Sequence, residues 1–414
     1  MPIGDGRTSD QADIRMTDRA TSPLAGVRVV ELARILAGPW IGQTLADLGA
    51  DVVKVEAPEG DETRRWGPPF VQRIDGTQED AAYFHCCNRV KRSVIADFRR
   101  ARDLDFVGRL VARSDIVIEN FKTGTLAKFG LDYASLKARN PRLVYCSVTG
   151  FGQDGPYAAR AGYDAMIQAM SGMMDITGDP DGEPQKIGVA LADILTGVYG
   201  VVAIQAALAA RERTGEGQQI DMALFDVMVG VLANQALNYF VSGKAPHRAG
   251  NAHPNIVPYQ TFPTSDGHVM LAVGSDAQFG KLCSLLERPD IGMDSRYATN
   301  ELRVRNRDAL IALLREELIA WKRDELLAKL AGVGVPAGPI NTIADVFADP
   351  QVRARGMRVD FDRPDIAGGK LFGLRSPLKF STSQLRLDRA APRLGEHTHA
   401  VARELGIDTS GWAD

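Results

Sequence analysis

One carboxylate stands out by its surroundings. Asp193 lies near the start of the apolar segment KIGVALADILTGVYGVVAIQAALAA, from Lys186 to Ala210. Burial in such company strongly disfavours the ionised form of a carboxyl group unless a partner offsets it. A carboxylate held at a helix start between apolar walls is poised to act as a nucleophile or a base. The same position suits an acid that only stabilises the positive end of the helix macrodipole, and the residues alone leave both interpretations open.

Further polar side chains stand where predicted strands end, which is where open α/β sheets bind ligands. Arg34 follows the run GVRVVELA, and Asn120 with Phe121 follows DIVIE. The basic clusters in DETRRWGPPF and NRVKRSV suit a phosphorylated ligand, although charge clusters more often form solvated surface. Tyr163 and Asp164 precede another predicted helix, where an aspartate also fits as a first-turn acid.

Several chemistries lack their sequence patterns. The turn after the first predicted strand reads ARILAGPWIG, without the glycines of GxGxxG, and the chain has no GxxxxGK[ST] motif. An NAD- or FAD-binding fold and a P-loop are therefore disfavoured. No GxSxG elbow is present, which disfavours a serine hydrolase. The 6 histidines and 4 cysteines lack the spacing of a metal site, so we expect no metal.

The bulk composition narrows the class of protein. The chain has 414 residues, which suggests two or three domains, and its net charge of −3 offers no basic field for nucleic acid. Cysteines without CxxC spacing predict free thiols in a reducing compartment, and we expect the protein in the cytoplasm. The polar residues 1–22 lack the apolar region of a secretory signal and predict a disordered tail. The apolar segment near 190–210 is the best candidate for a membrane span, but we expect a buried core helix and no membrane partner.

Strand and helix patterns alternate over the first half of the chain. The runs GVRVVELA, DVVKVEAP, RSVIADF, DIVIENF, LVYCSVTGFG and QIDMALFD read as strands. The alternation with amphipathic helices predicts a large, doubly wound, Rossmann-like α/β domain. Beyond residue 225 the pattern changes to that of a smaller α+β domain. We therefore predict a tail over 1–22, the large domain over 23–225, a linker and small domain over 226–345, and a segment over 346–414 that returns to complete the large domain.

Six segments carry a resemblance to a known family. They are PLAGVRVVELARILAGPWIGQTLADLGADVVKVEAPEGDETRRWGPPF, NRVKRSV, DIVIENFKTGTLAKFGLDY, GFGQDGPYAARAGYDAMIQAMSG, GVALADILTGVYG and RTGEGQQIDMALFD. Together they resemble family III CoA-transferases, the CaiB/BaiF group, which includes formyl-CoA transferase and the carnitine CoA-transferases. The resemblance extends from Pro23 to LGEHT near the C-terminus. It implies acyl-CoA and carboxylic acids as substrates, and no permanently bound cofactor.

The resemblance implies that Asp193 is the catalytic nucleophile. In this family an aspartate attacks the acyl-CoA thioester, forms an acyl anhydride and then carries CoA as a thioester. It further implies active-site neighbours at Tyr163, Asp164 and Gly250, the last within HRAGNAH. Implied contacts with CoA are Arg34, Ala37, Gly38, Ala96, Arg99, Asn120, Phe121 and Lys128. The segments GYDAMIQAMSG and GNAHPNIVPYQTFPTSDGH resemble the branch that uses succinyl-CoA.

The resemblance also implies an unusual assembly and one alternative reaction. Each subunit would be an open ring, and two rings would interlock into a homodimer. Racemases of the same superfamily, which abstract an α-proton from α-methylacyl-CoA, resemble the chain as well. They place a histidine before the aspartate of the AGxD motif, where this chain has Tyr163. Because a phenol is a poor base near neutral pH, the transferase is favoured over the racemase.

Overall fold

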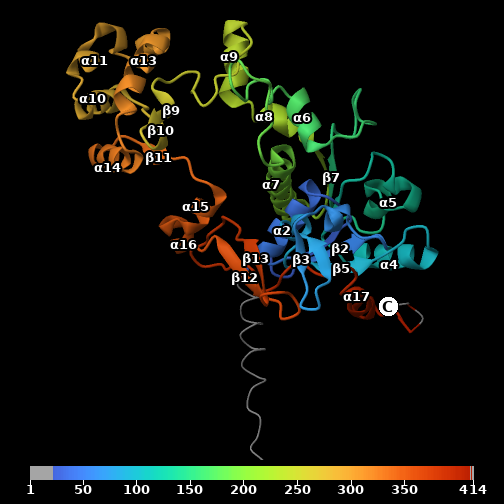
Figure 1. Ribbon diagram of the computed structural model, residues 1–414. Helices are drawn as coiled ribbons and strands as arrows, with labels where there is room; N and C mark the ends of the chain where they lie inside the picture. Colours follow the sequence, from blue (N-terminus) through green and yellow to red (C-terminus); the bar gives the residue numbers. More distant parts are fainter. Residues whose placement is uncertain (1–21, 411, 413–414) are drawn as a thin grey trace, which may run out of the picture. The chain divides into compact units, whose positions relative to one another are not determined.

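The computed structural model describes residues 22–410 and 412 (Figure 1), so nearly all of the predicted tail lies outside the described residues. The chain divides into two compact units. The described parts of the first are residues 22–172, 187–234, 353–410 and 412, and the second comprises 173–186 and 235–352. The sequence predicted domain boundaries at 225 and 345, and the chain passes from the first unit to the second after residue 234 and back after residue 352. Segment 173–186, which was predicted to lie in the large domain, belongs to the second unit.

Parallel strands form the sheet of the first unit. In the described chain they are β1 (Arg28–Glu31), β2 (Asp51–Glu56), β5 (Arg92–Ile95), β6 (Ile116–Glu119), β7 (Val144–Thr149) and β8 (Gln219–Ala223). Their order is β5-β2-β1-β6-β7-β8, and every pairing is parallel. This confirms the doubly wound fold. The order matches that of dinucleotide-binding domains, so the missing glycines exclude a phosphate-cradling turn but not the topology itself.

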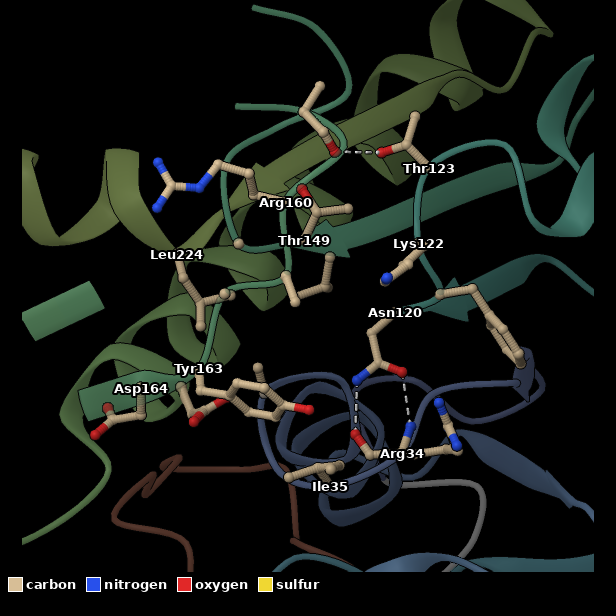
Figure 2. Close-up of a pocket in the computed structure, with 18 residues that line it drawn as sticks. Arg34, Ile35, Asn120, Lys122, Thr123, Thr149, Arg160, Tyr163, Asp164 and Leu224 are labelled. Atoms are coloured by element: carbon tan, nitrogen blue, oxygen red, sulfur yellow. Dashed lines mark hydrogen bonds between the residues drawn. The ribbon is translucent and has the colours of Figure 1, made fainter. Parts of the chain in front are cut away.

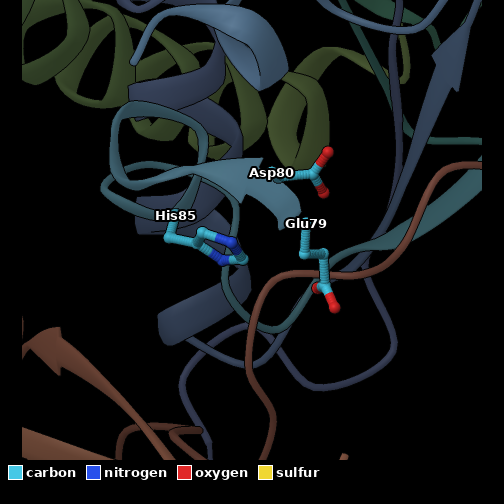
Figure 3. Close-up of side chains that lie close together, drawn as sticks. All are labelled: Glu79, Asp80 and His85. Atoms are coloured by element: carbon cyan, nitrogen blue, oxygen red, sulfur yellow. The ribbon is translucent and has the colours of Figure 1, made fainter. Parts of the chain in front are cut away.

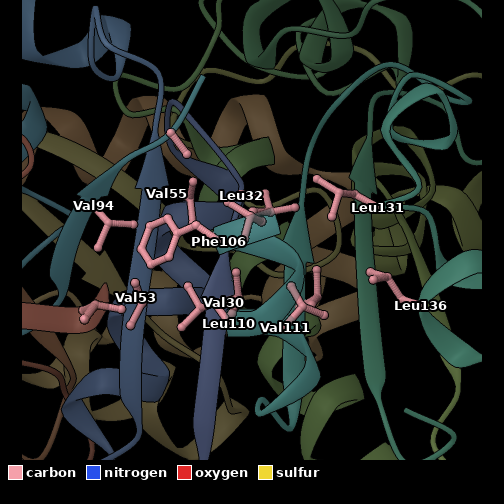
Figure 4. Packing of buried hydrophobic residues seen from close by; sticks show 14 of the residues in the cluster. Val30, Leu32, Val53, Val55, Val94, Phe106, Leu110, Val111, Leu131 and Leu136 are labelled. Carbon is pink, nitrogen blue, oxygen red and sulfur yellow. The ribbon is translucent and has the colours of Figure 1, made fainter. Parts of the chain in front are cut away.

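On one side of the sheet, β-branched side chains of the strands and one amphipathic helix form the core. Helix α4 (Ala101–Ala112) places Phe106 and Leu110 in a cluster with Val30, Val53 and other strand residues (Figure 4). Each such side chain stabilises the fold by roughly 1.5–3 kcal/mol when fully buried.

Two helices of the first unit, α2 (Ala37–Asp47) and α7 (Leu191–Thr214), pack closely together. A Cβ atom on Gly197 would lie 2.8 Å from the Trp40 side chain, and one on Gly200 would lie 2.5 Å from Ile41. Both positions therefore require the absence of a side chain. By length and composition α7 could cross a membrane, but here it packs against α2, β7 and α8 (Leu224–Gly230).

The C-terminal segment returns to the first unit and covers an edge of its sheet. It carries the hairpin β12 (Arg358–Asp362) and β13 (Lys370–Leu374), and the helix α17 (Thr398–Glu404). Edge strand β5 lies beside this helix. His397 donates its N–H to Ser93 O at 2.9 Å, and Ile95 donates its N–H to Thr398 Oγ1 at 3.1 Å. The C-terminal segment thus provides hydrogen-bond partners for backbone groups of β5 on the side where no further strand pairs with it.

The second unit is an α+β fold by itself. Strands β9 (Tyr259–Thr264), β10 (Gly267–Ala272) and β11 (Ala337–Pro339) form an antiparallel sheet. The helices of this unit are α10 (Asp276–Leu285), α11 (Pro289–Met293), α12 (Asn300–Arg305), α13 (Arg307–Leu318), α14 (Arg323–Val333) and α15 (Ile343–Ala348). Phe262 and Leu314 are among its fully buried core residues.

Short elements complete the described chain. They are η1 (Glu62–Arg65), β3 (Phe70–Gln72), β4 (Gln78–Ala81), α3 (Ala82–His85), η2 (Leu126–Phe129), α5 (Tyr133–Lys137), α6 (Asp164–Met170), α9 (Ala233–Ser242), η3 (Ser295–Tyr297) and α16 (Pro350–Ala354). The helix predicted to follow Tyr163 and Asp164 is α6, which has seven residues and begins at Asp164 itself. Helix α6 ends at Met170, and Gly172 follows with a φ of +86°, which favours glycine and turns the chain away.

Candidate active site

A pocket opens at the carboxyl ends of the central strands of the first unit (Figure 2). Its volume is about 220 Å³. Of the residues predicted from the sequence, it is lined by Arg34, Ala37, Asn120, Phe121, Tyr163, Asp164 and Asp193. Strands β1 and β6 lie side by side at the point where the strand order reverses, and both lead into this pocket. This is the place where doubly wound sheets bind ligands.

Asp193 is held between two helix starts. It is the third residue of α7, and it lines the pocket together with Ala37, the first residue of α2, whose backbone N–H favours the carboxylate form of Asp193 and so opposes the rise of its pKa. Burial, reinforced by the charge of Asp164, raises the pKa of Asp193 to about 7. Near neutral pH the group is therefore divided between acid and carboxylate, and the carboxylate form is poorly solvated.

Asp164 shapes the start of α7. Its Oδ1 accepts the N–H of Ala192 at 2.8 Å, and its Oδ2 accepts Gln168 Nε2 at 2.8 Å. Because Ala190 at the N-cap of α7 has no side-chain oxygen, Asp164 supplies the missing acceptor from α6. Tyr163 is the N-cap residue of α6 and is 66% exposed.

Asn120 fixes the turn that carries Arg34. Its Oδ1 accepts the Arg34 N–H at 2.9 Å, and its Nδ2 donates to Arg34 O at 2.7 Å, as the dashed lines in Figure 2 mark. The Arg34 guanidinium pairs with Glu62 at 2.8 Å and lies 5.4 Å from the ring centre of Phe121. Asn120 thus acts on the backbone of this turn with both ends of its amide.

A second pocket, of about 280 Å³, adjoins the first. Ala96 and Arg99 line it, and Arg34 and Phe121 line both pockets. The two pockets therefore share a wall and follow neighbouring strand ends. Arg99 is largely exposed and pairs with Asp97 at 2.8 Å.

Three other predicted positions lie outside these two pockets. Gly38 is buried in α2, and its Cβ would lie 2.3 Å from the Cβ of Ala33, so it serves helix packing. Lys128 is exposed on η2 and lines neither pocket. Gly250 belongs to the second unit and has a φ of +57°.

Arg64, Arg89 and Lys91 of the two basic clusters fold inward, whereas Arg65 stays exposed and Arg92 is partly buried. Arg64 pairs with Glu56 at 2.6 Å, and Lys91 pairs with Glu31 at 2.8 Å. These side chains are buried in ion pairs, so they form neither a solvated surface nor a phosphate site. Sequence spacing failed here because each acidic partner is contributed by another segment.

The sequence analysis missed three residues near Asp193. Lys122 and Arg160 line the same pocket, and the Arg160 guanidinium lies 4.5 Å from the ring centre of Tyr157. Burial and the charge of Asp193 raise the pKa of Tyr83, so its phenol stays protonated near neutral pH. Lys122 and Arg160 stand within motifs quoted above, whereas nothing in the sequence links Tyr83 to Asp193.

Glu79, Asp80 and His85 form a cluster elsewhere in the first unit (Figure 3), with ligand atoms within 4.8 Å of one another. Both carboxylates already have cationic partners. Arg363 donates to Glu79 at 2.8 Å, and Arg64 pairs with Asp80 at 2.5 Å. A metal ion would have to displace these arginines.

The comparisons with known proteins identify the family. A family model described as CoA-transferase family III matches residues 24–398. The chain belongs to CoA-transferase family III. The succinate–glutarate CoA-transferase of Agrobacterium fabrum is 56% identical over 92% of this chain and 96% of its own length. The human succinyl-CoA:glutarate CoA-transferase is 40% identical over 92% of this chain and 86% of its own.

A solved structure supports the same assignment for this transferase. The crystal structure of a CaiB/BaiF family protein from Brucella suis superimposes with a TM-score of 0.83 at 63% identity, covering 93% of this chain and 100% of that one. The protein is thus an enzyme that transfers CoA, and CoA thioesters are its substrates.

Proposed function

We propose that this enzyme moves CoA from succinyl-CoA to a dicarboxylic acid such as glutarate, with Asp193 as the covalent nucleophile. The observation that carries the proposal is the Asp193 carboxyl group, half-buried in the wall of a pocket between two helix starts, with the start of α2 at Ala37 in the same wall. The names of the relatives from Agrobacterium fabrum and human support the choice of acids.

Each step of the proposed reaction is a substitution at a carbonyl carbon. An Asp193 carboxylate oxygen attacks the succinyl-CoA thioester, the C–S bond breaks, and CoA leaves as a thiolate, which gives an anhydride. The thiolate attacks Cγ of Asp193, the anhydride C–O bond breaks, and succinate leaves. Glutarate then attacks the aspartyl thioester through its carboxylate, and the released thiolate attacks the new anhydride at the glutaryl carbon. Glutaryl-CoA forms and the Asp193 carboxylate is regenerated.

The Ala37 N–H supports two stages of this reaction. It stabilises the Asp193 carboxylate before attack, and it is aimed at the carboxyl oxygens that gain negative charge when the thiolate adds to Cγ. A dry pocket wall then protects the anhydride from hydrolysis.

Cationic side chains support an acyl group that carries a free carboxylate. Arg34, Lys122 and Arg160 line the pocket of Asp193, and positive groups there favour a substrate with a second carboxylate. For CoA itself we propose Ala96 and Arg99 in the second pocket, Arg34 and Phe121 between the two pockets, and Asn120 in the first. Lys128 and Gly250 stay predictions from the family resemblance.

Chemical trapping tests the proposal. The enzyme is mixed with succinyl-CoA, glutaryl-CoA or a long-chain acyl-CoA, quenched with hydroxylamine, digested and read by mass spectrometry. We expect an aspartyl hydroxamate at Asp193 with the first two donors and none with Asp193→Asn. Adduct only with the long-chain donor would refute the dicarboxylate assignment. No adduct, with deuterium exchange at the acyl α-carbon, would favour the racemase instead.

We also propose a homodimer and a reducing compartment. Val198, Tyr199 and Val202 form an exposed apolar stripe on α7, with Val202 60% exposed. Such a stripe suits contact with a second copy. Light scattering should give a dimer mass, and Val202→Asp should weaken it. The four cysteines are free thiols, which supports the cytoplasm.

A further inference from the structure

A cluster of buried charges lies beneath the turn that joins β1 to α2. The side chains of Glu31, Lys54, Asp61 and Lys91 are 0% exposed. Lys54 Nζ lies 3.1 Å from Glu31 Oε1 and 2.9 Å from Asp61 Oδ2. Lys91 Nζ lies 2.8 Å from Glu31 Oε2. Two ammonium groups thus balance two carboxylates, which is the condition under which buried charges persist.

The Lys54–Asp61 pair stays ionised near neutral pH. Burial alone would lower the pKa of Lys54, but the charges of Glu31 and Asp61 outweigh burial and raise it. Burial alone would raise the pKa of Asp61, but Lys54 and the Thr63 N–H lower it to about 2. Stability does not require such a cluster, because apolar replacements of buried ion pairs are often neutral or stabilising.

The cluster binds the backbone on both sides of Ala37. Lys54 Nζ donates to Ala33 O at 2.8 Å, and Lys91 Nζ donates to Pro39 O at 2.8 Å. The Ile35 N–H donates to Asp61 Oδ2 at 3.2 Å.

Ile35 explains why the turn needs these contacts. Its φ of +73° lies in the left-handed region, where a β-branched residue is strained. Such residues persist only when their surroundings over-determine the conformation, and they concentrate at functional sites. Two residues later, Ala37 lines the same pocket as Asp193, and its backbone N–H favours the carboxylate form of that group.

We propose that Asp61, itself held by Lys54, is a positioning residue for Asp193. It locks Ile35 in the left-handed conformation and so keeps the Ala37 N–H on the Asp193 carboxyl group. This inference rests on the proposed role of Asp193 as nucleophile. It adds to that role a buried charge cluster that fixes the position of the start of α2.

The direction in which the pKa of Asp193 changes distinguishes the hold of Asp61 on Ile35, called the lock below, from a purely electrostatic effect of the Asp61 charge. Losing the negative charge of Asp61 would, by Coulomb's law alone, lower the pKa of a nearby carboxyl group. Losing the Ala37 hydrogen bond would raise it, since that bond favours the carboxylate. The titratable and charged groups around Asp193 remain in every variant below: Asp164 of α6, Tyr83 of α3, and Arg34, Lys122 and Arg160 of the pocket.

The test compares two substitutions at one position in the full-length enzyme. Asp61→Ser keeps a cap for the Thr63 N–H, but its hydroxyl is too short to hold Ile35 and Lys54. Asp61→Asn removes the same charge and keeps an acceptor for the Ile35 N–H. For Asp61→Ser we expect a loss of kcat/KM for succinyl-CoA of about 100-fold. The acidic limb of its pH–rate profile, where activity rises as Asp193 ionises, should move to higher pH by about one unit. Asp61→Asn should show no upward move.

Rescue by glycine completes the test. Ile35→Gly makes the left-handed turn favourable without the lock, so the double variant Ile35→Gly/Asp61→Ser should recover the acidic limb of Ile35→Gly. If Asp61→Ser folds only with Ile35→Gly, that rescue supports the lock as well. The proposal is overturned if Asp61→Asn and Asp61→Ser shift the acidic limb of the pH–rate profile by the same amount. It is also overturned if adding Ile35→Gly to Asp61→Ser restores neither folding nor the position of that limb.

Trapping with hydroxylamine separates this inference from the proposed function. If Asp193→Asn kept transferase activity, the proposed nucleophile would fail and the lock would have nothing to position. If Asp193 is trapped and its variant is inactive, but Asp61→Ser keeps a normal profile, only the lock fails.

Discussion

Replacing Asp193 by asparagine should make the protein more stable while it abolishes CoA transfer. The structure raises the pKa of this carboxyl group from 3.8 to about 7, mainly by burial. Between these values the folded protein holds a proton that the unfolded chain has released. The free energy of unfolding therefore falls as the pH rises through this window, and it stays lowered above pH 7.

The size of the effect follows from the shift. A change from 3.8 to about 7 corresponds to about 4 kcal/mol, at 1.36 kcal/mol for each unit of pKa. Asparagine has nearly the same shape, keeps an oxygen for the Ala37 N–H and carries no charge to desolvate. The variant should match the native protein below about pH 4 and exceed it by up to about 4 kcal/mol above pH 7.

Urea unfolding of both proteins between about pH 5 and pH 8 measures this difference, with Asp154→Asn as the matched control. Asp154 is an exposed carboxylate of the same unit, and its variant should stay within about 0.5 kcal/mol of the native protein at each pH. A gain that is equal at both ends of the range, or no gain, would refute the claim that Asp193 is held in an unfavourable charged state.

Three further predictions follow from the site. The kcat/KM for acyl-CoA should rise with pH through about 7 as Asp193 ionises, and Asp164→Asn should move this limb to lower pH because it removes a like charge; pH–rate profiles measure both. Gly197→Ala should destabilise the protein by about 1–3 kcal/mol in thermal melts because its Cβ meets Trp40. Gly108→Ala in α4, whose Cβ would make only an ordinary contact of 3.7 Å with the Arg139 side chain, should be neutral or stabilise by up to about 1 kcal/mol. Asn120→Ala should raise KM for acyl-CoA by about 10-fold or more, since two hydrogen bonds to the Arg34 turn are lost.

Local patterns in the sequence predicted the sheet and much of the pocket. Strand periodicity located all six parallel strands of the described sheet, because most are short buried runs and β8 alternates between exposed and half-buried residues. Residues that follow those strands, such as Arg34 and Asn120, necessarily gather at one edge, and they do line one pocket. Asp193 could be singled out because its apolar neighbours make a free carboxylate costly.

What the sequence could not provide was long-range pairing of charge. Lys54 and Lys91 look like surface residues in isolation, and Glu31, 23 and 60 residues earlier in the chain, makes their burial tolerable. The left-handed backbone conformation of Ile35 could not be predicted either, since nothing in its residue type favours that conformation. The assignment of residues 173–186 to the second unit also depends on contacts far along the chain, such as the bond from Gly250 N–H to Gly178 O at 3.0 Å.

The edge of the parallel sheet has a consequence for biosynthesis. The groups that cover β5 come from His397 and Thr398, about three hundred residues later, and Arg92 of the same strand pairs with Glu404 at 2.8 Å. A nascent chain on the ribosome therefore exposes an open strand edge until nearly all of it has been made. Exposed edges are templates for aggregation, and non-local pairing slows folding. Expression of C-terminally shortened forms should consequently give insoluble protein, even when every residue of the pocket is present.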